Sequence, residues 1–180
     1  MNLQTLQVNL LNLVKSRSDI DDLDDAYLRE VASSQNLVLA KKIVLWWRQL
    51  QIQNYCVLTT RLLESYGKFE EYTQQFAKQK FSVFSEEAGD EFIDFINLAE
   101  DASPLLRSVS TFEKALIKLY KGDMINEVIP WCYEPMSVIQ SLLDKTFSES
   151  ILQPGDYTVR VSHELGANLF RVAEISPALS

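Results

Sequence analysis

The chain has 180 residues, 47% of them hydrophobic, and its 17 basic and 25 acidic residues give a net charge of −8. Such a chain is long enough to bury one hydrophobic core, so a single domain, with or without a small appendage, is expected. Its negative charge repels phosphate backbones and anionic lipid headgroups, so we predict no nucleic-acid partner and no membrane partner.

No apolar run reaches the ~18 residues of a spanning helix, and residues 1–14 have neither a cationic start nor a small-residue cleavage site. The two cysteines, Cys56 and Cys132, are too few for a disulfide framework and are expected to be buried free thiols in a reducing compartment. We therefore predict a cytoplasmic protein and make no prediction of its oligomeric state.

The N-terminal third of the chain carries helical patterns. Leucines at helical spacing predict a helix from about Leu3 to residues 15–17. The acidic run 18–25 then supplies the cap and the negative first turn of a second helix, over about residues 24–32.

The stretch Asn36–Tyr66 contains no Gly and no Pro and predicts one long helix or two consecutive helices. Its middle is apolar nearly all round, so we expect it to be buried as a scaffold that covers the apolar faces of the other helices. Trp46 and Trp47, with Arg48 beside them, could stack on a base or a sugar. Within so apolar a helix we interpret the two tryptophans as core residues.

Three more helices are predicted before residue 123. Gly67 favours a left-handed helix end, and the aromatic residues after it predict an amphipathic helix. Another begins at Ser85, although Gly89 obscures its start. The last has the fullest signal, because Ser103 is an N-cap residue, Pro104 suits the first helical position and a glycine follows the helix. The expected ranges are 69–81, 85–98 and 104–120, with Gly122 as the final stop.

The sequence pattern changes after residue 122, where strand-like spacing begins. A rigid aromatic loop is expected over Pro130–Pro135, and alternating residues predict an antiparallel hairpin near the C-terminus. The other expected elements are a strand at 125–129, a helix at 136–143, a turn at 153–156 and hairpin strands at 157–162 and 169–175. The predicted fold class is mainly α, with an N-terminal multi-helix domain (1–122) and a small mixed α+β C-terminal part (123–180), packed on the helices, that contains a β-hairpin.

Few residues suit catalysis or metal binding. The single histidine, His163, excludes a multi-histidine metal site within one chain. The window Asp19–Glu30 has the length of a calcium loop, but Leu23 and Asp24 stand where an oxygen ligand and a glycine are needed. No phosphate loop, nucleophile elbow or Cys-x-x-Cys pair occurs. We predict no catalytic residue, no metal ligand and no cofactor.

The candidates for partner binding lie in the C-terminal part. Prolines flank Trp131 and Tyr133, so the expected loop holds two aromatic side chains in a preset position, as is typical of binding anchors. The alternative is that this loop only staples the C-terminal part to the helices. Arg160, in a hairpin strand, and His163, at the end of that strand, complete the set of candidates.

Three groups of residues between Gln51 and Asp123 carry a family resemblance. They are Ile52-Gln53-Asn54-Tyr55 followed by Leu58, Leu62, Leu63 and Tyr66; the aromatic series Phe69, Tyr72 and Phe76, continued by the apolar run Phe92–Leu98; and Leu105-Leu106 with Phe112-Glu113-Lys114-Ala115-Leu116. In order and spacing they resemble the HvfC/BufC-like family, helical proteins once labelled as DNA-binding domains. The resemblance implies a partner subunit of a TIM-barrel, non-haem iron enzyme that modifies ribosomally made peptides and whose peptide substrate the subunit helps to hold. The first fifty residues show nothing of this family, and no metal ligand carries over.

The leading hypothesis is a non-enzymatic interaction protein with a protein or peptide partner, because the β edge of the C-terminal part offers main-chain groups to an extended segment. One alternative is a small enzyme with a site near His163 and Cys132, as a thiolate–imidazole couple. Another is a nucleic-acid-binding regulator, which the negative charge disfavours.

Overall fold

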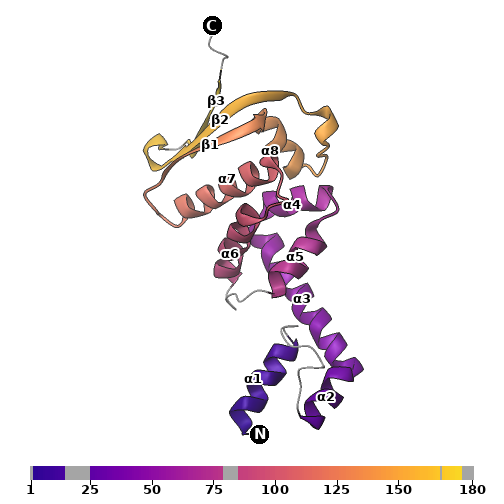
Figure 1. The fold of residues 1–180 in the computed structure, drawn as a ribbon. Coiled ribbons are helices and arrows are strands. Elements are labelled where there is room, and N and C mark those ends of the chain that lie inside the picture. Colours follow the sequence, from indigo (N-terminus) through magenta and orange to yellow (C-terminus); the bar gives the residue numbers. More distant parts are fainter. Residues whose placement is uncertain (1, 15–24, 79–84, 167, 176–180) are drawn as a thin grey trace.

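The computed structural model describes residues 2–14, 25–78, 85–166 and 168–175. These residues form a helical body that carries one small sheet towards its C-terminal end (Figure 1). The helices are α1 (Leu3–Val14), α2 (Ala26–Ser33), α3 (Gln35–Tyr55), α4 (Val57–Ser65), α5 (Phe69–Lys78), α6 (Ser85–Leu98), α7 (Pro104–Tyr120) and α8 (Pro135–Leu143). The predicted mainly α fold is confirmed.

The sheet has the strand order β1-β2-β3, with both pairs antiparallel. Its strands are β1 (Asn126–Tyr133), β2 (Pro154–Ser162) and β3 (Phe170–Glu174), and β2 with β3 is the predicted hairpin. The short 3-10 turns Glu149–Ile151 and His163–Leu165 stand before and after β2. The mixed C-terminal part is therefore confirmed, and the strand predicted at 125–129 is β1, which pairs with the hairpin and continues to Tyr133.

Local capping signals were reliable guides to the ends of helices. The Ser103 hydroxyl accepts a hydrogen bond from the Leu106 amide at 3.1 Å, and Pro104 is the first residue of α7. Gly122, just past α7, has a φ of 89°, and Gly67, just past α4, has a φ of 67°. Glycine adopts this left-handed conformation at little cost, so both helices end where the sequence predicts.

The stretch 36–66 forms two helices, and the break at Cys56 is stabilised from a distance. Cys56 has φ −112° and ψ 65°, and its side chain does not cap α4. Instead, the carboxylate of Glu113, on α7, accepts hydrogen bonds from the backbone amides of Leu58 at 2.7 Å and Thr59 at 2.9 Å. Glu113 is only 7% exposed. It therefore acts as the N-cap of α4 from a helix that lies more than fifty residues later in the chain.

Burial of Glu113 leads to a pH dependence of stability. Burial raises the pKa of its carboxyl above the usual 4.5, while the hydrogen bonds from Thr59 and Leu58 oppose that shift. Because the folded-state pKa is the higher one, this carboxyl contributes stability that is fully present below pH 4.5 and is lost as the pH rises through the raised pKa. We expect the free energy of unfolding of Glu113→Gln to lack this decline. Urea unfolding of both proteins at several pH values measures this decline. The same dependence of the unfolding free energy on pH in both proteins would contradict the prediction.

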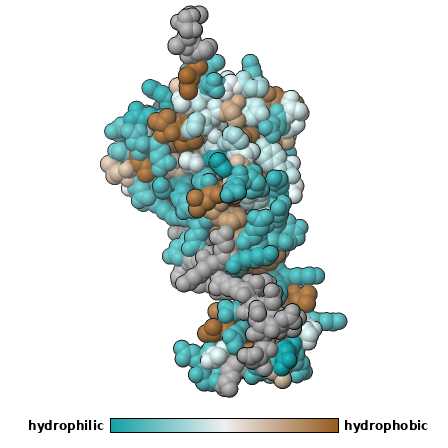
Figure 2. Space-filling model, viewed as in Figure 1, coloured by the Kyte–Doolittle hydropathy of each residue, from teal (hydrophilic) through white to brown (hydrophobic). Residues whose placement is uncertain are grey.

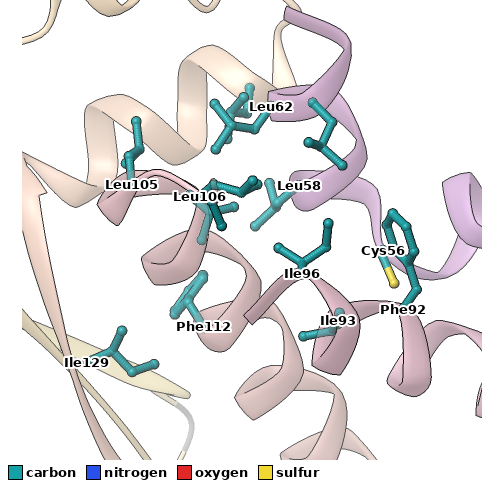
Figure 3. Packing of buried hydrophobic residues seen from close by; sticks show 14 of the residues in the cluster. Cys56, Leu58, Leu62, Phe92, Ile93, Ile96, Leu105, Leu106, Phe112 and Ile129 are labelled. Carbon is teal, nitrogen blue, oxygen red and sulfur yellow. The ribbon is translucent and has the colours of Figure 1, made fainter. Parts of the chain in front are cut away.

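One hydrophobic core joins the helical body to the sheet. Side chains from α4, α6 and α7 converge in it, and Ile129 reaches it from β1 (Figure 3). The ring of Phe112 packs edge-on against Trp131 of β1, with ring centroids 5.8 Å apart, and against Phe170 of β3 at 5.1 Å. The sheet thus packs directly on α7, and residues on both sides of position 122 share this core.

A second, smaller cluster holds the N-terminal helices against α3. Its buried residues are Leu13, Leu28 and Leu37. The opposite side of α3 is not covered by described residues: Trp46 is 58% exposed and Trp47 is 54% exposed. Figure 2 shows isolated hydrophobic residues among hydrophilic ones on the visible face of this part of the molecule. The expectation that the middle of this stretch is buried, with both tryptophans in the core, is therefore wrong, because described residues cover only one face of α3.

Two further predictions are corrected. Pro130, Trp131 and Tyr133 lie in strand β1 and not in a loop, because an outer strand tolerates a proline whose missing amide is not needed for pairing. The turn expected at 153–156 is instead the beginning of β2, which starts at Pro154. The predicted helix over 136–143 is confirmed as α8. The acidic residues 18–24 and Phe81 lie outside the described residues.

Candidate functional site

A cavity of about 580 Å³ lies between the N-terminal half of α7 and β1. We call it the β1 groove. Both walls contribute polar and apolar groups. The α7 wall consists of Pro104, Arg107, Ser108 and Thr111, and the wall from β1 runs from Glu127 to Cys132, with Asp156 of β2 beside it.

The backbone of β1 is open on the side of the groove. Within the described sheet β1 pairs with β2 alone, so its other edge has no strand. The amide of His163 donates to the Ile125 carbonyl, which shows that odd-numbered residues of this strand exchange hydrogen bonds with β2. The backbone groups of Val128 and Pro130 therefore point away from β2.

A serine on α7 fixes the position of this open edge. The Ser108 hydroxyl lies 2.6 Å from the Pro130 carbonyl oxygen and donates a hydrogen bond to it. Pro130 has no amide hydrogen, so its main chain is already satisfied. Val128, whose side chain is 63% exposed, is left as the residue that presents both an amide and a carbonyl at the centre of the edge.

Trp131 and Tyr133 lie at one end of β1. Trp131 is only 2% exposed and packs against Phe112, so its indole is a core group and not a surface anchor. Its Nε1 has no hydrogen-bond partner among the described residues. The Tyr133 hydroxyl donates to Glu149 at 2.9 Å, and this hydrogen bond raises the pKa of Tyr133.

Arg160, on β2, and His163, just after β2, contact the start of β1 through their side chains. The Arg160 guanidinium donates to Asn126 at 2.9 Å and to Glu164 at 2.8 Å. The exposed His163 has its Nδ1 2.7 Å from the Ile125 carbonyl oxygen. Of the four predicted residues, only Trp131 lines the groove. Tyr133 follows it on β1, whereas Arg160 on β2 and His163 just after β2 reach Asn126 and Ile125 at the start of β1.

The thiolate–imidazole couple of the enzyme hypothesis is not assembled. His163 is hydrogen-bonded to the Ile125 carbonyl, and Cys132 lies seven residues further along the same extended segment. At ~3.3 Å per residue, Ile125 and Cys132 are therefore roughly 20 Å apart. Burial also raises the pKa of the Cys132 thiol, which favours the unreactive protonated form. Cys56 is fully buried, and burial raises its pKa as well.

Sequence reasoning missed the α7 wall of the groove. The sequence pattern gives only ordinary polar positions of an amphipathic helix at Arg107, Ser108 and Thr111. A periodic pattern does not reveal which polar residue contacts a distant strand. The serine at an otherwise buried position was the available signal, since Ser108 is 7% exposed and a buried hydroxyl needs a partner.

The described residues contain no group of three or more His, Cys, Asp or Glu that could hold a metal ion. Within the same part of the chain, none of the helices combines the length and the apolarity needed to cross a membrane. Comparisons with models of protein families, with curated proteins and with solved structures each found no match. The family resemblance therefore stays a prediction that rests on the residues themselves.

Proposed function

We propose that this protein is a non-enzymatic interaction subunit that holds an extended peptide along the open edge of β1. The observation that carries the proposal is the groove of about 580 Å³ beside a strand edge whose backbone groups point away from β2. Strand addition of this kind draws affinity from main-chain hydrogen bonds and specificity from pockets for alternate side chains. The β1 groove supplies both features, with Val128 at its centre.

The two walls of the groove suit a peptide more than a small polar molecule. One wall is a strand edge, which an extended chain matches residue by residue. The other combines Pro104 with the polar side chains of Arg107 and Thr111, so that side chains on one face of a peptide would meet both apolar and hydrogen-bonding surface. Arg107 is held in place by a hydrogen bond to the Ala99 carbonyl at 2.8 Å.

The finer part of the proposal is that the peptide is the substrate of a modifying iron enzyme to which this protein is bound. Its support is the resemblance over residues 51–123, which includes α7 and therefore the helical wall of the groove. Copurification from the native host followed by mass spectrometry tests this part. Recovery of the peptide without a reproducible enzyme partner would restrict the function to peptide binding.

A proline at Val128 is expected to weaken peptide binding strongly while the fold is kept. The substitution removes the amide hydrogen that faces the open edge, and it leaves the hydrogen bonds to β2 intact. Pro130, another even-numbered residue of β1, shows that the strand accepts a proline at such a position. Peptides of twelve residues selected by phage display on the native protein serve as probes. We expect Val128→Pro to weaken their affinity at least about ten-fold, as the loss of a main-chain hydrogen bond and of close approach requires.

The matched control is Val128→Ala, which shortens the same side chain but keeps the amide, and its affinity should stay within about three-fold of that of the native protein. Thermal unfolding of both variants shows whether the sheet is intact. Unchanged affinity of a folded Val128→Pro variant would disprove strand addition at this edge. Amide hydrogen exchange adds a direct readout, because a bound strand should protect the Val128 amide.

A further inference from the structure

The hydrogen-bonding edge of β1 is interrupted two residues from Val128, at Pro130. Both residues are even-numbered, so their backbone groups face the β1 groove and not β2. Pro130 has no amide hydrogen, and its carbonyl oxygen accepts a hydrogen bond from Ser108 at 2.6 Å. The same hydroxyl oxygen lies 2.9 Å from the Pro104 carbonyl oxygen of its own helix. Ser108 is therefore held between two carbonyl groups at the wall of the groove.

This interruption decides what a peptide bound along the edge can contain. When one peptide residue exchanges hydrogen bonds with Val128, the peptide residue two positions along faces Pro130. There the peptide carbonyl meets no donor, and the peptide amide meets an oxygen that already accepts from Ser108. An amide hydrogen enclosed without an acceptor weakens binding, because its bond to water is lost and not replaced. A proline at this position of the peptide has no amide hydrogen to leave unpaired.

We propose that the β1 groove selects extended peptides with a proline at the residue that faces Pro130, and that the Ser108 hydroxyl sets this preference. Ser108 acts on the peptide through the Pro130 carbonyl, so it is a positioning residue. Proline also has a φ fixed at about −65°, so it loses less conformational freedom on binding than other residues do. The inference rests on the proposed function, because it names the class of peptide that the open edge accepts.

A proline scan measures the preference. Peptides of twelve residues, selected by phage display on the native protein, receive proline or alanine at each position in turn, and fluorescence anisotropy gives their affinities. Proline at the residue paired with Val128 should weaken binding at least about ten-fold relative to alanine, because a main-chain hydrogen bond is lost. At the residue that faces Pro130, proline should bind about two- to five-fold more tightly than alanine. This residue lies two positions N-terminal to the first in an antiparallel peptide and two positions C-terminal in a parallel one.

Two variants separate the missing donor from the occupied acceptor at Pro130. Ser108→Ala frees the Pro130 carbonyl, so the alanine peptide should gain about three- to ten-fold in affinity while the proline peptide gains nothing, and the preference disappears or reverses. Pro130→Ala supplies the missing amide, so both peptides should bind more tightly by a similar factor. Ser110→Ala is the matched control and should change neither affinity, because Ser110 is a buried serine of α7 that donates to Asn97 and does not line the groove.

Amide hydrogen exchange distinguishes failure of this inference from failure of the proposed function. Protection of the Val128 amide in the native complex establishes strand addition whatever the sequence of the peptide, and an unprotected amide would contradict both proposals. If the amide is protected but Ser108→Ala leaves the ratio of the proline and alanine affinities unchanged, selection by Ser108 is overturned and the proposed function stands. Thermal unfolding shows which variants are folded. The absence of any gain in a folded Pro130→Ala variant would equally overturn the inference.

Discussion

Replacing Glu113 with alanine is expected to lower the free energy of unfolding by about 3 kcal/mol. The reason is the interaction across the break between α3 and α4, where the carboxylate accepts from the amides of Leu58 and Thr59 at 2.7 and 2.9 Å. Alanine leaves both amides at the start of α4 without this acceptor and opens a void around a site that is 7% exposed in the native protein. The desolvation of a carboxylate is also removed, and this offsets part of the loss.

Urea unfolding monitored by circular dichroism measures the effect. Glu113→Gln, which keeps one acceptor oxygen, should lose less than the alanine variant. Glu100→Ala is the surface control, because Glu100 is an exposed residue outside any helix, and its change should stay within about 0.5 kcal/mol. A loss below about 1 kcal/mol in Glu113→Ala would show that α4 does not depend on this cap.

Gly89→Ala should destabilise the protein by about 2 kcal/mol, although alanine is the better helix former. A Cβ at position 89 would lie 1.9 Å from Cδ1 and 2.5 Å from Cγ of Tyr55. These atoms belong to the base of the ring and not to a flexible tip. The ring is further held by the Nζ of Lys121, which lies 5.4 Å from its centroid. The end of α3 must therefore shift away from α6.

A double-mutant cycle makes this second expectation specific. In a Tyr55→Ala background the clash is absent, so Gly89→Ala should become neutral or stabilising by up to about 1 kcal/mol, in line with helix propensity. Unfolding free energies of the four proteins give the coupling directly. If Gly89→Ala costs the same in both backgrounds, contact with Tyr55 is not the reason for this glycine.

Helix ends with local signals could be predicted from the sequence, and features that depend on distant partners could not. Ser103, Pro104 and Gly122 act within one turn of their own helix, so their residue types suffice. The break at Cys56 has no such signal, because its cap comes from Glu113 on another helix. Gly89 appeared only as a defect in a helix pattern, and its packing partner explains it.

The same limit applies to exposure and to the site. The apolar pattern of α3 could not show that Trp46 and Trp47 would lie on the uncovered face, since a pattern records hydrophobicity and not which neighbours arrive. Two prolines suggested a loop at 130–135, yet Pro130 sits in an outer strand where its missing amide is harmless. The β edge itself was expected, but the wall that faces it, with Ser108, required the fold.

The pairing of Ser108 with Pro130 also bears on self-association. An open strand edge is a template on which further copies of a protein can stack into continuous sheets. Here Pro130 has no amide hydrogen to donate, and its carbonyl oxygen already accepts a hydrogen bond from the Ser108 hydroxyl at 2.6 Å. A ladder that starts at Val128 therefore meets a gap within two residues. The same gap would keep a guest strand of the proposed kind short, and it interrupts the long, continuous pairing from which fibrils grow.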